Sequence, residues 1–176
     1  KNIYKVIVSI IETDGILEKF EDKKNYGEKK IIDNSSIRYG ILNYVAKYSL
    51  AKNSYFVTSK CYEHLNNLNL MRNGKLLRGS KGSKNKFTFE HPVPSNVIAD
   101  EVIKNIGDKN KIKKILRETD LVTVITYQEN DMITKSGYAN EMPENSFVKK
   151  NMFARYEMSG VEVPSRKIEV YGAIAR

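Results

Sequence analysis

The sequence predicts a mixed α+β protein with a helical N-terminal half and a C-terminal half that combines helices and strands. Two early segments, 3–11 and 37–46, carry apolar residues at helical spacing. All four prolines lie beyond residue 91, and the segment 119–126 is rich in β-branched residues, which favour a buried strand. With 176 residues and 40% hydrophobic content, the chain can bury one sizeable core, so we expect a single globular domain, 1–176.

Three helices are expected in the subregion 1–70. The first covers 3–11 and the second 37–46, where Ser35 or Ser36 supplies the hydroxyl that caps a helix N-terminus. The third is expected across 55–67. The second half is more varied. Its expected elements are a strand at 87–90, a helix from 95 to 106, a basic helix at 109–118, a strand at 119–126, a helix from 132 to 137 and a helix within 152–161. The closing segment 166–176 is expected to be a final strand or a partner-facing segment.

The charge balance favours a polyanionic partner. There are 30 Lys and Arg residues against 21 Asp and Glu, which gives a net charge of +9. Nucleic acid is therefore the expected partner, and DNA is preferred over RNA. The single cysteine, Cys61, allows neither an internal disulfide nor a Cys-rich zinc site, so we expect a cytoplasmic protein. No run of 18 apolar residues exists, which excludes a transmembrane helix, and we expect no membrane partner.

The clearest basic feature is the segment 72–86, which contains no acidic residue. A basic segment that extends along a phosphate backbone contributes affinity that is independent of sequence and sensitive to salt. A solvated loop is the alternative; if so, the basic helix at 109–117 becomes the next candidate. Asn73-Gly74 signals a turn inside the segment. The expected nucleic-acid contacts are Arg72, Lys75, Arg78, Lys81, Lys84 and Lys86.

The two histidines have different settings. His91 follows Phe87-Thr88-Phe89-Glu90 and precedes Pro92-Val93-Pro94, so it lies at a strand end between a carboxylate and two residues of fixed φ. That setting suits a general base, and it also suits an ordinary turn. His64 lacks such neighbours, and we interpret it as a helix-surface or core-edge residue.

The segment 86–136 resembles the HNH, or ββα-metal, nucleases. Glu90-His91-Pro92 looks like the end of the first strand of that family, where the catalytic histidine follows an acidic residue or a histidine. The run from Asp120 to Asn130 is similar to the second strand and the helix that carries the last metal ligand. The resemblance implies a nuclease core at 86–136, with 137–176 as a C-terminal extension.

The resemblance also implies roles for individual residues. His91 would be the general base, and Glu90 a metal ligand. The last ligand would be Asn130 or Glu129, with Asn130 preferred. Asp120 occupies the place of an asparagine that pins the loop in the family; a carboxylate accepts such hydrogen bonds but donates none. No cysteine lies near the second strand, so the structural zinc of some members is not expected.

The chemistry of these residue types agrees with phosphodiester hydrolysis. A neutral histidine can accept the proton of an attacking water near pH 7. Oxygen ligands suit Mg²⁺ or Mn²⁺ completed by water and phosphate oxygens. We therefore expect a metal-dependent DNA endonuclease of the restriction, homing or phage-defence type. The sequence does not decide whether the protein forms a homodimer. The alternatives are a non-catalytic nucleic-acid-binding protein and a metal-independent ribonuclease that uses His91.

Structural alternatives accompany each assignment. His91 can bridge the strand end to the backbone, and 129–131 can be only a polar helix start, because Asn and Asp favour helix caps. Arg155, in the helix expected at 152–161, could reach a phosphate, although a structural salt bridge is the preferred interpretation.

Overall fold

The computed structural model describes Lys5, Ser9 and residues 36–50, 52–77, 85–105, 107–146 and 149–171. The helix predicted over 3–11 therefore lies outside the described residues, apart from those two positions. Three of the six predicted nucleic-acid contacts, Arg78, Lys81 and Lys84, also lie outside them.

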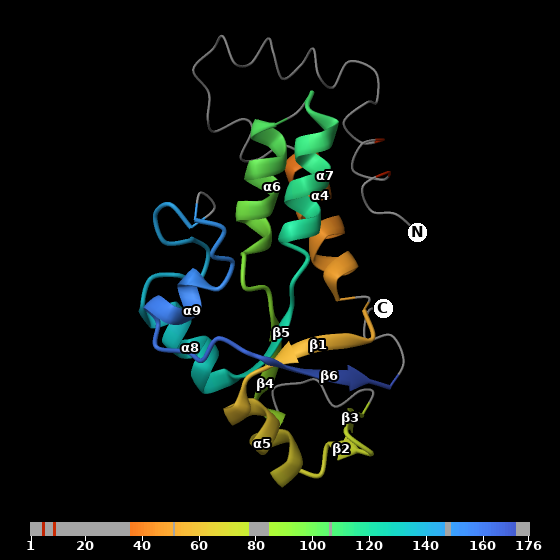
Figure 1. Ribbon diagram of the computed structural model, residues 1–176, viewed down its shortest axis with the longest axis vertical. Coiled ribbons are helices and arrows are strands. Elements are labelled where there is room, and N and C mark those ends of the chain that lie inside the picture. The colour runs from red at the N-terminus through yellow and green to blue at the C-terminus, as the bar shows by residue number, and fades with distance from the viewer. Residues whose placement is uncertain are drawn as a thin grey trace.

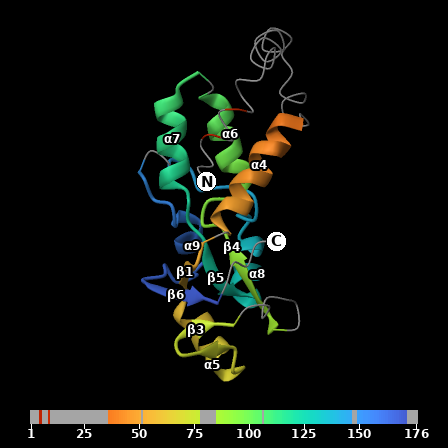
Figure 2. The ribbon, with the colours of Figure 1, turned by 90° about the vertical axis from the view of Figure 1, so that its right-hand side faces the viewer.

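The described residues form a mixed α+β fold with two parts (Figure 1). Three helices, α4 (Ser36–Ser49), α6 (Ser95–Lys104) and α7 (Lys109–Glu118), stand beside one another above a six-stranded sheet in both ribbon views (Figure 2). Three further helices pack on the sheet: α5 (Ser59–Asn67), α8 (Tyr127–Lys135) and α9 (Ala154–Met158). No helix among the described residues is long and apolar enough to cross a membrane.

The sheet has the strand order β2-β3-β6-β1-β5-β4. Its central strand β1 pairs in parallel with β5 and antiparallel with β6, while β4 pairs antiparallel with β5 at one edge. The other edge is the β2–β3 hairpin, closed by Asn73 and Gly74 with φ of 50° and 72°, which confirms the predicted turn. The strands are β1 (Ser54–Val57), β2 (Met71–Arg72), β3 (Lys75–Leu76), β4 (Phe87–Glu90), β5 (Thr123–Thr126) and β6 (Arg166–Val170).

The strand β5 is buried along its whole length, as its β-branched sequence predicts. Successive side chains of a strand point to opposite faces, and here each face has its own cluster. Val124 packs in a cluster with residues of α5, β1 and β4, while Ile125 packs with Ile133 of α8 and Tyr156 of α9. A third cluster lies among α4, α6 and α7. The sheet is therefore covered by α5 on one face and by α8 and α9 on the other.

The helix predicted across 55–67 is wrong at its start. Residues 54–57 form β1, in which Tyr55 and Val57 are buried, and the helix begins only at Ser59. The hydroxyl of Thr58 accepts a hydrogen bond from the Cys61 amide at 3.2 Å and caps α5. The three apolar or aromatic residues there, 55–57, fit a strand as well as a helix. A strand therefore lies within the range 1–70, which was expected to be helical.

Other boundaries differ by a few residues. α8 begins at Tyr127 rather than near Met132, because Thr126 caps it, and α9 covers only 154–158 of the expected 152–161. The break between α6 and α7 is confirmed: Gly107 has φ of 100°, which suits glycine, and Asp108 accepts a hydrogen bond from the Lys111 amide at 2.9 Å. The final strand is confirmed as β6.

Candidate functional site

The last residue of β4, Glu90, forms an ion pair with Arg155 of α9. The Arg155 side chain is only 1% exposed, and that of Glu90 is 22% exposed. The Arg155 guanidinium also donates hydrogen bonds to the carbonyl oxygens of Tyr138 at 2.7 Å and Ala139 at 3.2 Å. The structural salt bridge preferred for Arg155 is confirmed, and the carboxylate of Glu90 is committed to it.

Burial governs the charges around this pair. It lowers the pKa of Arg155 to about 10, so the guanidinium remains protonated near pH 7. Tyr156, the next residue, is also fully buried, and burial raises the pKa of its hydroxyl. A positive charge in such surroundings needs a counter-charge, which Glu90 supplies.

His91 follows β4 directly, as predicted, and is half-buried. Pro92 and Val93, the next two residues, are buried. The chain therefore packs inward immediately after the histidine. The role of His91 as a general base stays a prediction.

Glu129 serves as part of a helix cap. It is 4% exposed, and its Oε2 accepts hydrogen bonds from the Thr126 amide and the Thr126 hydroxyl, both at 2.8 Å, and from the Thr58 hydroxyl at 3.1 Å. The Thr126 hydroxyl in turn accepts from the Glu129 amide at 3.2 Å, which completes a capping box. The alternative that this segment is a polar helix start is thus confirmed for Glu129. The same contacts join α8 to the N-terminus of α5.

Asn130 and Asp120 lie on different elements, Asn130 on α8 and Asp120 just before β5. Asn130 is half-buried on α8 and is rotated by about 100° from Glu129 around the helix axis. Asp120 accepts a hydrogen bond from Ser49 at 3.0 Å and pairs with Lys52 at 2.7 Å. Asp120 therefore ties the end of α4 to the start of β5 and accepts hydrogen bonds, as expected of a carboxylate.

The predicted metal ligands start from opposite ends of the β4–β5 pair. Glu90 lies opposite Thr123, whereas the carboxylate of Glu129 accepts hydrogen bonds from Thr126, which lies three residues or about 10 Å further along β5. In the described part of the chain, no three His, Cys, Asp or Glu residues gather in a way that could hold a metal ion. The ion pair of Glu90 and the hydrogen bonds of Glu129 also occupy these carboxylates. These residues therefore fit a metal poorly as they are arranged.

The described residues of the basic segment are split between the two edges of the sheet. Arg72 and Lys75 face each other across the β2–β3 hairpin, and Lys75 pairs with Glu169 at 2.5 Å, which raises the pKa of Lys75. Lys86 precedes β4 at the opposite edge of the sheet. β4 lies four strand spacings, or about 19 Å, from β3, the strand that carries Lys75. The two described ends of the segment therefore lie at different edges of the sheet.

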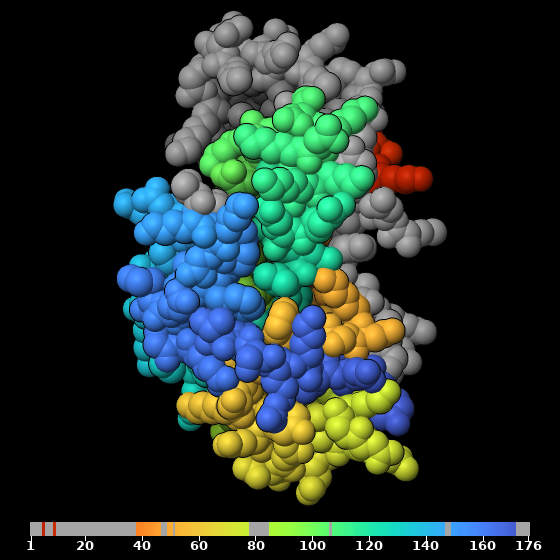
Figure 3. Space-filling model, in the orientation of Figure 1, coloured from red at the N-terminus to blue at the C-terminus, as the bar shows by residue number. Residues whose placement is uncertain are grey.

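A second basic surface lies on α7. Its buried side chains are Ile112 and Leu116, and the exposed Lys113, Lys114 and Arg117 lie on the other side at helical spacing. Among the described residues, no acidic side chain pairs with Lys114 or Arg117. In the view of Figure 3, α7, drawn in green, lies at the molecular surface. We call Lys113, Lys114 and Arg117 the α7 basic face.

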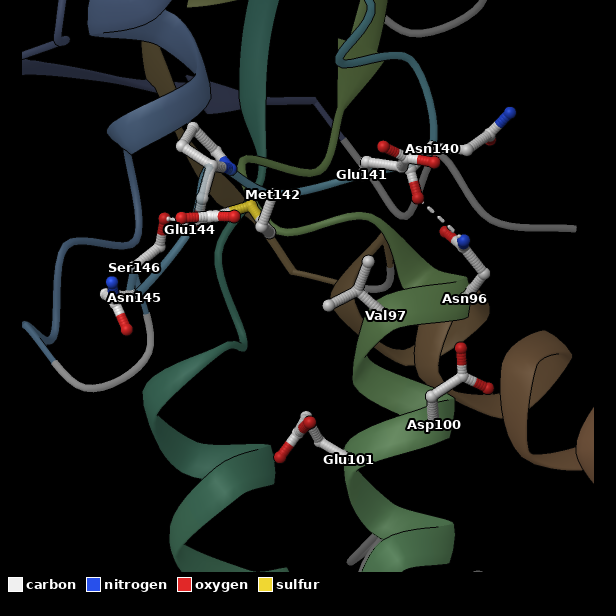
Figure 4. A pocket seen from close by; sticks show the side chains of 11 residues that line it. Asn96, Val97, Asp100, Glu101, Asn140, Glu141, Met142, Glu144, Asn145 and Ser146 are labelled. Atoms are coloured by element: carbon white, nitrogen blue, oxygen red, sulfur yellow. Dashed lines mark hydrogen bonds between the residues drawn. The ribbon is translucent and has the colours of Figure 1, made fainter.

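Two pockets have opposite electrostatic character. The larger, about 620 Å³, lies between α6 and the segment 140–146 (Figure 4). Four carboxylates line it, so it disfavours phosphate: Asp100, Glu101, Glu141 and Glu144.

The smaller pocket, about 240 Å³, lies between α5 and the start of α8. It is lined by Lys60, Glu63, His64, Asn67, Lys86, Thr126, Tyr127 and Gln128. Sequence reasoning missed it. The available signal was the polar spacing of 60, 63, 64 and 67, which is i, i+3, i+4 and i+7 of one helix face.

No family model, no curated protein and no solved structure matches this chain.

Proposed function

We propose that the protein binds nucleic acid and that the α7 basic face contacts the phosphate backbone. The observation that carries this proposal is the amphipathic arrangement of α7, in which Ile112 and Leu116 fix the helix on the core while three cationic side chains face solvent. Exposed lysine and arginine residues neutralise phosphates and release counterions, which drives binding. The net charge of +9 adds electrostatic attraction at longer range.

A salt titration of affinity for duplex DNA tests this proposal. Replacing Lys114 and Arg117 by Gln should weaken binding to all sequences alike, and should reduce the slope of log K against log salt by about 1.8, or about 0.9 per lost phosphate contact. The matched control replaces Lys149 and Lys150, two exposed lysines outside α7, and removes the same charge. Equal loss in both variants would show that only net charge matters and would refute the α7 interface.

The basic segment can be tested in the same titration. Neutralising Lys81, Lys84 and Lys86 together should leave the slope unchanged if the segment only solubilises the protein. A flatter slope would add the segment to the interface.

We also propose endonuclease activity as a second candidate function. The observation that favours it is local: β4 and β5 pair antiparallel, α8 follows β5 and packs against both strands, and His91 follows β4. That order is the one expected of a ββα core. The predicted ligands Glu90 and Asn130 do not fit a divalent metal as they are arranged, because Glu90 is held in the ion pair with Arg155. Only His91 can be assigned a chemical role, the removal of a proton from water.

Plasmid cleavage measured with Mg²⁺, Mn²⁺ and EDTA tests this second function. His91→Ala should reduce the cleavage rate by about 10²-fold to 10⁴-fold and leave DNA affinity unchanged, because the general base is lost while the α7 basic face remains. Cleavage at the parental rate in His91→Ala, or no cleavage by the parent protein with either metal, would exclude the assignment.

A further inference from the structure

We propose that the pocket between α5 and α8 binds a nucleoside monophosphate group, as a free nucleotide or as the phosphorylated end of a strand. This site is separate from the α7 basic face, since α5 and α7 lie towards opposite ends of the described part of the chain in Figure 1. The proposal does not depend on nucleic-acid binding by α7. The pocket of about 240 Å³ is below the usual size of sites that enclose a drug-sized ligand, so a single nucleotide is the largest unit that it would hold, with part of the nucleotide in solvent.

The charges in the pocket suit a phosphate beside a sugar. Lys60 and Lys86 are exposed, and neither has an acidic partner within the described part of the chain. Two ammonium groups attract a phosphate dianion as point charges. Glu63, the one carboxylate among the lining residues, can accept hydrogen bonds from ribose hydroxyls.

The remaining side chains suit a base. Tyr127 is half-buried, and its ring offers a face on which any base can stack. Gln128 and Asn67 carry amides that both donate and accept hydrogen bonds, as base edges require. The N-terminus of α8 is not the anion site, because the Glu129 carboxylate already occupies it.

Two hydrogen bonds hold the walls of the pocket in fixed positions. The Nε2 of His64 lies 2.8 Å from the Asn85 carbonyl oxygen. This nitrogen is the donor, because a carbonyl oxygen only accepts. The Tyr127 amide donates to the Lys86 carbonyl at 2.9 Å. The segment 85–86 is thus tied to both α5 and α8, so His64 is a positioning residue.

Lys86 has an unusual backbone conformation. Its φ of 53° lies in the left-handed region, which is unfavourable for a lysine. Glycine or asparagine would adopt it more easily. A strained position that presents a cation to a pocket is consistent with a binding role.

Calorimetry together with amide chemical shifts tests the site, with adenosine 5′-monophosphate (AMP) as the probe. AMP should shift the amides of Tyr127 and Gln128, and adenosine should bind at least about tenfold more weakly because it lacks the charged phosphate. Replacing Tyr127 by Leu should weaken AMP binding about tenfold through lost stacking. Absence of shifts at these amides would overturn the proposal.

The charge requirement has a closely matched control. Replacing Lys60 and Lys86 by Gln should weaken AMP binding about tenfold. The same change at Lys149 and Lys150 should alter it less than about twofold; Lys150 matches Lys86 in exposure and in its φ of 54°. An equal loss in the control would show non-specific attraction and overturn the site.

The source of the phosphate is decided by competition. An oligonucleotide with a 5′-phosphate that displaces AMP, while its 5′-hydroxyl form does not, identifies a strand end. Displacement by neither identifies a free nucleotide, and both results support the site. Displacement by both forms would contradict it, because the terminal phosphate would then be irrelevant. AMP binding should survive neutralisation of Lys114 and Arg117, so failure of the α7 interface and failure of this pocket are distinguishable.

Discussion

The two ends of β4 carry charged residues with opposite fates. Immediately before its start, Lys86 is exposed beside a pocket and has no acidic partner among the described residues. At its end, four residues later, Glu90 is held by Arg155, whose side chain is almost completely buried. The strand is the same, so the difference comes from what packs against each end. A charge beside a buried counter-charge becomes structural, whereas a charge beside an open pocket remains able to bind a ligand.

The physical reason for the difference is desolvation. Removing a guanidinium from water costs several kcal/mol, and the cost is recovered only where a carboxylate and further hydrogen bonds satisfy the group. Arg155 has Glu90 and two backbone carbonyls for this purpose. An exposed ammonium remains hydrated and needs no such partner.

The largest expected effect on stability is at the buried end. Glu90→Ala should lower the free energy of unfolding by about 3–5 kcal/mol, because it leaves the Arg155 charge buried without its counter-charge. Glu90→Gln should lose less, since its amide oxygen still accepts a hydrogen bond. Urea unfolding measures the change. Cys61 provides a second probe of unfolding. Its thiol is buried, and burial raises its pKa, so it should react with a thiol reagent only when the protein opens.

The control for this measurement is an exposed pair. Glu169→Ala breaks the contact between Glu169 and Lys75 at the protein surface, where solvent screens the interaction, and should cost far less than Glu90→Ala. Similar losses in the two variants would show that burial of Arg155 does not decide the role of Glu90.

Much of the secondary structure follows from local sequence. The α6–Gly107–α7 break is marked by a glycine and an aspartate cap, β5 by a β-branched run, and β6 by its apolar alternation. β1 was missed, because four residues such as 54–57 satisfy either a helical or a strand period. Such a segment is decided by its neighbours: β5 and β6 pair with it from both sides.

The site was harder to predict than the fold. The local pattern around His91 drew attention to Glu90, yet the partner that fixes Glu90 is Arg155, which lies far away in the sequence. The pocket likewise combines residues of 60–67, 86 and 126–128. Only α5 supplies a local signal, and a polar helix face is usually just solvated. Contacts between distant segments are set by sheet pairing, which one sequence does not specify.

The smallest expected effect on stability is at Lys86, just before β4. It distinguishes backbone strain at this position from a role of the side chain in binding. Lys86→Gly should raise the free energy of unfolding by about 0.5 kcal/mol, because the relief of a left-handed lysine exceeds the entropy that glycine loses on folding. Lys150→Gly, at a φ of 54°, should give the same gain. Only Lys86→Gly should also weaken AMP binding. If Lys86→Gly instead destabilises the protein while Lys150→Gly does not, the Lys86 side chain supports the fold, and both ends of β4 are structural.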